Sequence, residues 1–299
     1  MPNLLLAAPT ATASMRAMPT PAHPAVKLSV SIVLFNSSLD LFDRTLRSLE
    51  RASAVARSAD CVDRVTVYVV DNSVDPSRQQ AAKSFVNAWP ADDFFQLQFV
   101  AQPENLGFGA GHNSVISDLD SDYHLVLNPD VELSEDALRV GLTTLHEDSG
   151  VALVSPRVSG DDGRQEFLCK RYPSVLVLLL RAFAPRFIRR IFYRRLGRYE
   201  MRDTCSGDRE VEIMLASGCF MLVRTRALLG AGGFNDDYFL YFEDFDLSLR
   251  LGGQGRLIFN PAMKIVHRGG YAASKGLQHV RYFLRSGVMF FNQHGWRWI

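Results

Sequence analysis

Short runs of β-branched and aromatic residues recur along the first half of the chain. The runs that predict strands are Leu28–Phe35, Val65–Val70, Gln96–Val100 and His124–Leu127. Between the first two runs, apolar residues recur instead at the spacing of an amphipathic helix, at Leu39, Phe42, Leu46, Leu49 and Ala52. Strands that alternate with helices predict an α/β fold, with a mostly parallel sheet covered by helices on both faces.

Polar residues follow the carboxyl end of each predicted strand. These residues are Asn36, Asp71, Asn105 and Asp130. In an open α/β sheet, ligands bind beyond the carboxyl ends of the strands, so all four residues would face one crevice. Asn and Asp are also ordinary turn formers, which is the alternative explanation for each position taken alone.

Composition narrows the class of protein only a little. The chain has 299 residues, 47% of them hydrophobic, which is enough for one large or two small domains. The formal net charge of +1 gives no electrostatic reason to expect a nucleic-acid partner. The cysteines are scattered without a C-x-x-C pair, which disfavours a zinc site or disulfide framework and fits a reducing compartment.

The N-terminus predicts neither a secretion signal nor a membrane anchor. No basic residue precedes the short apolar run Leu4–Ala8, and Pro9 ends it. We therefore expect residues 1–25 to be a disordered leader. The longest apolar run, Val175–Leu180, is far shorter than the roughly 20 residues of a membrane-spanning helix.

Two loops carry residues suited to a nucleotide and a metal. The segment from Glu104 to Asn113 is dense in glycine and precedes a predicted helix, so its backbone could approach a phosphate closely. A plain loop explains it equally well. Asp130, in Asn128-Pro129-Asp130, could bind a hard divalent cation, and a simple β-turn is the alternative.

Acidic residues set among aromatic residues mark the second half of the chain. Apolar spacing predicts a helix that begins near Glu243, so that Glu243, Asp244 and Asp246 lie in its first turn. Solvated acids at a helix N-terminus are one interpretation. A carboxylate in a partly apolar setting, ready to act as a general base, is the other.

A single histidine follows soon after these acids. A strand at Leu257–Phe259 and a turn at Asn260-Pro261 are predicted just before His267. A lone histidine is more often structural than functional. Neutral imidazole is nevertheless a good ligand for Mn²⁺-like ions, and the following Gly-Gly pair would let the chain wrap around such a site.

The segment 174–198 combines a run of apolar residues with many arginines. This pattern predicts a basic amphipathic helix that lies on an anionic membrane surface. A helix packed with one solvated face, or a contact between subunits, would produce the same pattern.

Together these motifs resemble the inverting glycosyltransferases of family 2, which have the GT-A fold. The resemblance covers about residues 28–270 and follows the family's order: the first strand at Ser29–Asn36, Val69–Ser73, Glu104–Gly109, Leu127–Asp130 and Glu243–Asp246. It implies a Rossmann-like, mostly parallel central sheet flanked by helices, with a C-terminal acceptor-side region. The implied domain covers residues 26–270, with a donor half at about 26–150, an acceptor half at about 151–270 and a helical extension at 271–299.

The resemblance also assigns roles to individual residues. The implied donor-binding residues are Asn36, Asp71, Asn105, Gly107, Gly109 and Asn128. Asp71 would bind the pyrimidine base. Asp130 stands at the end of the family's metal-binding Asp-x-Asp motif, whose first Asp is Asn128 here, and similarity to galactofuranose-transferring relatives suggests His267 as a further ligand of Mg²⁺ or Mn²⁺.

On the acceptor side, Asp244 matches the family's catalytic base. Gly218, Glu243 and Asp246 are the implied acceptor-side residues. The expected reaction is a single in-line displacement that inverts the anomeric centre of a nucleotide-sugar. Such a reaction needs no covalent nucleophile, and the sequence has no Ser-His-Asp pattern.

Within the family, the sequence resembles bacterial rhamnosyltransferases that use a dTDP-sugar and build cell-surface polysaccharide or lipopolysaccharide. The expected partners are therefore a nucleotide-sugar and a saccharide or lipid-linked saccharide. We expect the protein in the cytoplasm, with peripheral contact to the inner membrane. The alternatives are a nucleotidyltransferase and a non-catalytic nucleotide-sugar-binding module. The first loop lacks the basic, glycine-rich signature usual in the former, and both Asp130 and Asp244 argue against the latter.

Overall fold

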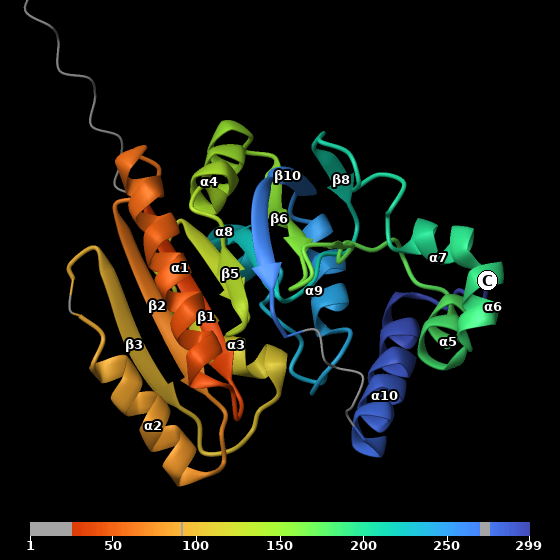
Figure 1. Cartoon of the computed structure of the whole chain (residues 1–299), viewed down its shortest axis with the longest axis horizontal. Helices are drawn as coiled ribbons and strands as arrows, with labels where there is room; N and C mark the ends of the chain where they lie inside the picture. The colour runs from red at the N-terminus through yellow and green to blue at the C-terminus, as the bar shows by residue number, and fades with distance from the viewer. Residues whose placement is uncertain (1–25, 91, 270–275) are drawn as a thin grey trace, which may run out of the picture.

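A computed structural model describes residues 26–90, 92–269 and 276–299 of the chain. The leader expected at residues 1–25 lies outside the described residues. Ten strands of the described chain form a single sheet, in which eight follow the order β3-β2-β1-β4-β9-β6-β10-β5 and two short ones pair at its margin. The predicted α/β class is confirmed (Figure 1).

The first half of the sheet is entirely parallel. Its strands are β1 (Lys27–Leu34), β2 (Arg64–Asp71), β3 (Phe95–Ala101) and β4 (Tyr123–Leu127). Each agrees with a strand predicted from the hydrophobic pattern to within about one residue at either end. Because β1 pairs in parallel with both β2 and β4, and β2 with β3, the carboxyl ends of all four strands lie at one edge.

The second half of the sheet is mixed. Its strands are β5 (Val131–Leu133), β6 (Val151–Ser159), β7 (Gln165–Glu166), β8 (Val211–Ile213), β9 (Phe220–Arg224) and β10 (Arg256–His267). Strand β9 runs antiparallel to both β4 and β6, and so joins the two halves. Strand β10 is parallel to β6 but antiparallel to β5, which brings His267 opposite Val131.

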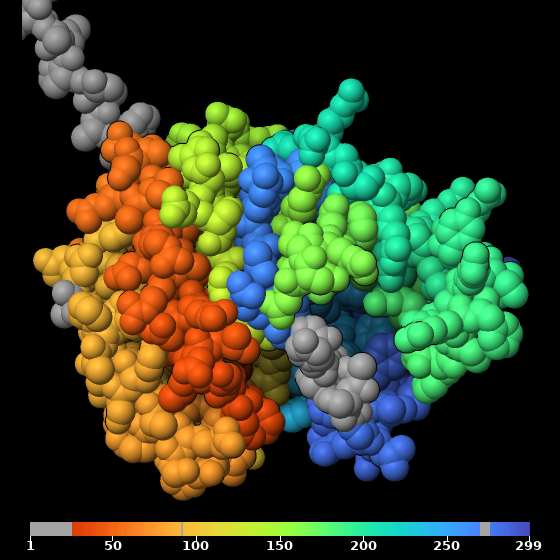
Figure 2. Space-filling view, viewed as in Figure 1, coloured from red at the N-terminus to blue at the C-terminus, as the bar shows by residue number. Residues whose placement is uncertain are grey.

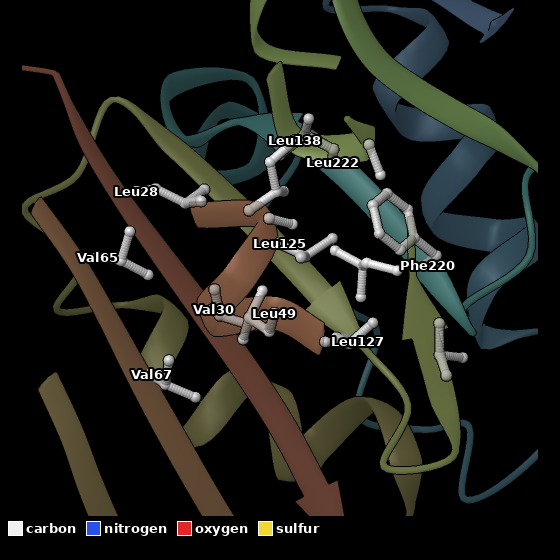
Figure 3. Close-up of a cluster of buried hydrophobic side chains, with 14 of the residues drawn as sticks. Leu28, Val30, Leu49, Val65, Val67, Leu125, Leu127, Leu138, Phe220 and Leu222 are labelled. Atoms are coloured by element: carbon white, nitrogen blue, oxygen red, sulfur yellow. The ribbon is translucent and has the colours of Figure 1, made fainter. Parts of the chain in front are cut away.

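Helices cover both faces of the sheet, as predicted. One face packs against α1 (Leu39–Ser58), α2 (Pro76–Asn87) and α4 (Ala137–Glu147). The other packs against α3 (Phe108–Ile116), α8 (Thr225–Gly230) and α9 (Glu243–Gly252). Figure 3 shows the first core, where Val30 and Leu125 from the sheet meet Leu49 of α1, each of them fully buried.

The remaining helices gather beside the sheet, at the end remote from β3 (Figure 1). They are α5 (Val175–Phe183), α6 (Arg186–Ile191), α7 (Tyr193–Tyr199) and α10 (Leu277–His294). A small aromatic core, which includes Tyr238, Phe242, Phe290 and Phe291, joins α10 to the start of α9. None of the helices in the described chain combines the length and apolar character needed to cross a bilayer.

Two local predictions were wrong. The basic segment is three short helices rather than one. Pro185 ends α5, because it has no N–H to donate and forces Ala184 into an extended conformation with ψ of 133°, and a second break at Phe192 separates α6 from α7. The turn expected at Asn260-Pro261 lies inside β10. There the pairing with β6 shifts register between Asn260 and Lys264, so proline occupies a bulge instead of ending the strand.

Candidate functional site

The carboxyl edge of the parallel strands holds a small cavity between β1 and β2. Its volume is about 100 Å³, and Asn36, Asp71 and Arg78 are among its lining residues. Asn36 has a left-handed backbone with φ of 52°, and its N–H donates to the hydroxyl of Ser73 over 3.0 Å. The Oδ1 atom of Asp71 accepts the Ser73 N–H at 2.8 Å, whereas its Oδ2 atom is buried with no hydrogen-bond partner. A buried carboxylate oxygen without a partner is costly, so it is a candidate for binding a ligand's N–H group.

The glycine-dense loop lies next to this cavity and begins α3. The side chain of Asn105 accepts the N–H of Gly107 at 3.0 Å, and Asn72 donates to the Gly107 carbonyl at 2.8 Å. Gly107 has φ of 88°, and a Cβ atom there would collide with the carbonyl of Phe239. These glycines are therefore required by close packing against protein, and the role of Gly107 and Gly109 in donor binding stays a prediction.

Asp130 and His267 come together at the junction of β4, β5 and β10. The Nε2 atom of His267 lies 3.6 Å from Oδ1 of Asp130, and its Nδ1 lies 3.4 Å from Oε2 of Glu166. Burial alone would lower the pKa of His267, but Asp130 and Glu166 offset burial and raise that pKa above its usual value. Gly269 packs so closely that any Cβ there would overlap the Asp130 carboxylate.

This pair fits a divalent cation that shares its coordination with a substrate. The Oδ1 atom of Asp130 is buried and has no hydrogen-bond partner, so it is an orphaned hard oxygen ligand beside an imidazole. In the described part of the chain, no cluster of three or more His, Cys, Asp or Glu side chains is arranged to hold a metal by itself. Two protein ligands, completed by phosphate oxygens and water, are typical of metals that bind nucleotides.

Asp244 is held at the start of α9 by a turn at residues 217–219. Its Oδ2 accepts the N–H of Gly218 at 3.0 Å, and its Oδ1 accepts the N–H of Phe245 at 2.9 Å. Burial raises the pKa of Asp244, against the lowering effect of these backbone donors and of the Lys170 charge. The carboxylate is therefore fixed in place and more basic than an exposed aspartate, as proton abstraction requires.

The same turn reaches the Asp130 side of the edge. The carbonyl of Cys219 accepts the N–H of Asn128 at 3.0 Å. Burial raises the pKa of Cys219 to about 12, and the charges of Asp130, Asp244 and Glu166 all add to that rise. The charges of Asp130 and Asp244 therefore both influence the Cys219 thiol, although the two acids are far apart in sequence.

The other two acids of α9 have different surroundings. Glu243 is 5% exposed and its Oε2 has no hydrogen-bond partner; burial, followed by the charge of Asp244, raises its pKa well above the usual value. Asp246 pairs with Arg250 over 2.5 Å and with Nε2 of His294 over 2.8 Å. Asp246 therefore ties α9 to α10. The acceptor-side roles of Glu243 and Asp246 stay predictions.

Backbone strain precedes α9. Tyr241 and Phe242 are consecutive non-glycine residues with left-handed φ values of 71° and 68°. Such conformations are unfavourable for bulky side chains and concentrate at functional sites. Here Phe242 is anchored in the aromatic core, and the strained turn determines where Glu243 and Asp244 enter the helix.

Sequence reasoning missed a cation beside the candidate base. Lys170 pairs through its backbone with Leu215, is 5% exposed, and has its pKa lowered to about 8 chiefly by burial. Its ammonium lies 5.9 Å from the ring centre of Tyr199, whose buried hydroxyl has no hydrogen-bond partner. No motif marks a lone lysine, so only the fold could have identified it.

Two characterised rhamnosyltransferases are similar in sequence to this chain. The chain is 25% identical over 224 residues to N-acetylglucosaminyl-diphospho-decaprenol L-rhamnosyltransferase of Mycobacterium tuberculosis. The matched region covers 71% of this chain and 69% of that protein. It is also 28% identical over 172 residues to the rhamnosyltransferase WbbL of Escherichia coli K12. This second match covers 54% of this chain and 61% of WbbL.

Solved structures with the same architecture confirm the GT-A fold. GalNAc-T7, solved with UDP, GalNAc and Mn²⁺, superposes with a TM-score of 0.59 at 13% identity. The superposition covers 90% of this chain, which spans about half (48%) of that longer one. The mannosyltransferase PcManGT of Pyrobaculum calidifontis, in complex with GDP-Man and Mn²⁺, gives 0.55 at 17% identity, over 86% of this chain and 60% of that chain.

The sequence model named Glycosyl transferase family 2 matches residues 29–228. That range runs from the third residue of β1 through β9 and includes Asp71, Asp130 and the turn at residues 217–219. The chain belongs to glycosyl transferase family 2.

Proposed function

We propose that this chain transfers a sugar from a nucleotide-sugar to an acceptor hydroxyl with inversion, using Asp244 as the base and Asp130 with His267 as metal ligands. The donor would bind to the half at about residues 26–150 and the acceptor to the half at about 151–270. One observation carries the proposal: a single turn, residues 217–219, holds Asp244 through its N–H and bonds to Asn128 through its carbonyl. The candidate base and the metal-binding segment are therefore positioned by one rigid element.

Asp244 would take the proton of the acceptor hydroxyl as that oxygen attacks the anomeric carbon. One C–O bond forms while the bond to the leaving diphosphate breaks, so the configuration inverts and no enzyme-linked intermediate is needed. Two backbone N–H groups fix the carboxylate, and partial burial keeps its pKa above that of an exposed aspartate. Both effects favour proton transfer at neutral pH.

Asp130 and His267 would hold a divalent cation, which supplies positive charge to the leaving diphosphate. Glu166 contacts the far nitrogen of His267 and would orient the imidazole ring. The free Oδ2 of Asp71 would accept the N–H of a pyrimidine base. Asn36 lines the same cavity, and Asn105 would hold the loop at Gly107 against the donor. That the GalNAc-T7 and PcManGT structures contain Mn²⁺ supports a divalent metal here.

The substrates follow from the relatives. Both named relatives transfer rhamnose, so we propose dTDP-rhamnose as donor. The mycobacterial relative is named for an acceptor sugar linked through diphosphate to a polyprenol, so we propose a lipid-linked saccharide as acceptor, in the synthesis of a cell-surface polysaccharide. With such an acceptor, we propose that the enzyme works in the cytoplasm, at the inner face of the inner membrane.

A calorimetric screen of nucleotide-sugars, each with and without Mg²⁺ or Mn²⁺, tests the proposal. The expected result is metal-dependent binding selective for one dTDP- or UDP-sugar. Incubating that donor with a polyprenyl-diphosphate sugar should then give a lengthened saccharide. Formation of a nucleotide-sugar from a sugar phosphate would instead indicate a nucleotidyltransferase, and tight binding without transfer would indicate a non-catalytic module. If no nucleotide-sugar bound under any condition, the proposal would be wrong.

A further inference from the structure

Positive charge is concentrated in two segments that are far apart in sequence. Residues 171–199 and 276–299 together contain eleven of the 33 basic side chains and none of the 32 acidic ones. The rest of the chain carries 22 basic against 32 acidic residues. The net charge of the chain is close to zero only because the positive charge of these two segments offsets the negative charge of the rest.

The fold brings the two segments together. The N–H groups of Val175 and Leu176 donate to the carbonyls of Arg297 and Trp298 over 2.8 and 3.1 Å, and the Tyr172 hydroxyl donates to the Gly295 carbonyl. In Figures 1 and 2, α5 to α7 and α10 adjoin at one end of the molecule, and the C-terminus lies beside α5 and α6. We call this surface, formed by α5 to α7, α10 and residues 295–299, the basic face.

The arginines of the basic face are largely free of carboxylates. No acidic group of the described chain lies within ion-pair distance of the exposed guanidinium groups of Arg186, Arg189, Arg190, Arg194, Arg195 and Arg198. An open hollow of about 930 Å³ on this face is lined by seven arginines, with Glu200 and Asp203 as the acids at its margin. Arginine forks bind phosphate oxygens in pairs, so the hollow favours phosphate groups.

The same face exposes large apolar side chains. Helix α6 has no buried residue, and Phe187 and Ile191 are 67% and 70% exposed. Trp298 and Ile299 of the tail are 64% and 75% exposed. Helix α10 buries Phe290 and Phe291, but it also exposes apolar residues at helical spacing, together with Arg281 and Arg285: Leu277, Val280, Leu284 and Val288. Apolar groups with arginines between them suit a bilayer interface, where the former enter the acyl region and the latter reach the headgroups.

We propose that the basic face is a docking surface for an anionic phospholipid bilayer. Phosphate headgroups occupy the arginine-lined hollow, while Phe187, Ile191 and Trp298 insert below them. The aromatic core that holds α10 also contains Phe242, immediately before α9, so docking sets the proposed base close to the membrane. The docking inference rests on the proposed function, because that function is what puts the acceptor in the membrane. Its test measures vesicle binding and not sugar transfer, so the docking inference and the proposed function can fail separately.

Vesicle flotation of the full chain tests this proposal directly. The wild type should float with vesicles of equal parts phosphatidylglycerol and phosphatidylcholine, should not float with phosphatidylcholine alone, and should be released by high salt. The variant R186E/R189E/R190E should lose at least about 100-fold in binding, because each arginine near the surface contributes about fivefold or more. Helix α6 buries no side chain, so these changes leave the core intact.

The matched control is R51E/R64E/R209E, which makes the same charge change at exposed arginines away from the basic face. It should float like the wild type. A second variant, F187S/I191S, should weaken flotation without changing net charge. Equal loss in the control, or equal binding to neutral vesicles, would overturn the proposal. So would dimerisation or RNA binding through this face without vesicle binding.

Discussion

The ion-pair cluster that joins α9 to α10 allows the account of the site to be tested through stability. Asp246 accepts from Nε and NH2 of Arg250 at 2.9 and 2.5 Å and from Nε2 of His294 at 2.8 Å. The substitution Asp246→Ala removes all three bonds and leaves the Arg250 guanidinium and the His294 ring without their carboxylate partner. Because α9 also carries Asp244, we expect both the free energy of unfolding and the transfer rate to fall.

The magnitude follows from burial. The Asp246 side chain is 3% exposed, whereas those of Arg250 and His294 are 28% and 20% exposed. Removing one partner of a buried ion pair costs about 3–5 kcal/mol, and water that reaches the partly exposed Arg250 and His294 side chains reduces this cost to roughly 2–3 kcal/mol. Helix α1 offers a matched control, because Asp43 and Arg47 have the same spacing at 2.8 Å, with 30% and 60% exposure. Asp43→Ala should cost only about 0.3–0.5 kcal/mol.

Urea unfolding followed by circular dichroism measures both variants under the same conditions, and the shift in midpoint at constant slope gives the difference in free energy. The double variant Asp246→Leu/Arg250→Met should recover part of the loss, since replacing both partners leaves no unpaired buried charge. Equal effects of Asp246→Ala and Asp43→Ala would refute the assignment of Asp246 as a buried tie between the helices.

Three further predictions concern other parts of the molecule. Gly269→Ala should raise the Mn²⁺ concentration needed for half-maximal activity by roughly 10–100-fold, because the added Cβ would displace the Asp130 carboxylate. Gly252→Ala is the control, because a Cβ there has open space around it, and it should leave the Mn²⁺ requirement unchanged. Equal Mn²⁺ titrations of the two variants would contradict the prediction. Burial lowers the pKa values of His112 and His124 to about 3. Between about pH 6.5, the pKa of histidine in the unfolded chain, and about pH 3, these two rings therefore bind a proton only when the chain is unfolded. Stability should therefore be fully present at neutral pH and fall as the pH drops, by up to about 1.4 kcal/mol per pH unit for each histidine, and a flat urea midpoint between about pH 7 and pH 5 would argue against it. Lys170→Met should move the acidic limb of the kcat/KM profile to higher pH, because the lysine charge lowers the pKa of the proposed base; an unmoved limb would show that the two groups do not interact.

The parallel half of the fold could be predicted because its strands and helices are specified by residues close together in the sequence. Strands β1 to β4 are short runs rich in β-branched and aromatic residues that end at turn residues, and α1 has a clear helical period. The second half could not be predicted in the same way. Its β9 runs antiparallel between β4 and β6, and Pro261 is accommodated by a bulge in β10, and neither feature has a signal within a short window of sequence.

The candidate site shows the same division. The acids at strand ends and at the start of α9 were visible in sequence, because turn chemistry and helix phase place them. The connection between them was not visible, since it depends on a backbone N–H of Gly218 and a backbone carbonyl of Cys219. Backbone groups carry no sequence signature. The two segments of the basic face likewise became one surface only through hydrogen bonds between α5 and the C-terminal tail.

The central claim is that Asp244 removes the proton from the acceptor hydroxyl, and the substitution Asp244→Asn tests it most directly. The amide keeps the shape but cannot act as a base, so sugar transfer should fall by about 10²–10⁴-fold while calorimetric donor binding stays unchanged. Asp237→Asn, on an exposed residue before the same helix, should transfer at the wild-type rate. Near-normal transfer by the Asp244→Asn enzyme, with donor binding intact, would contradict the account.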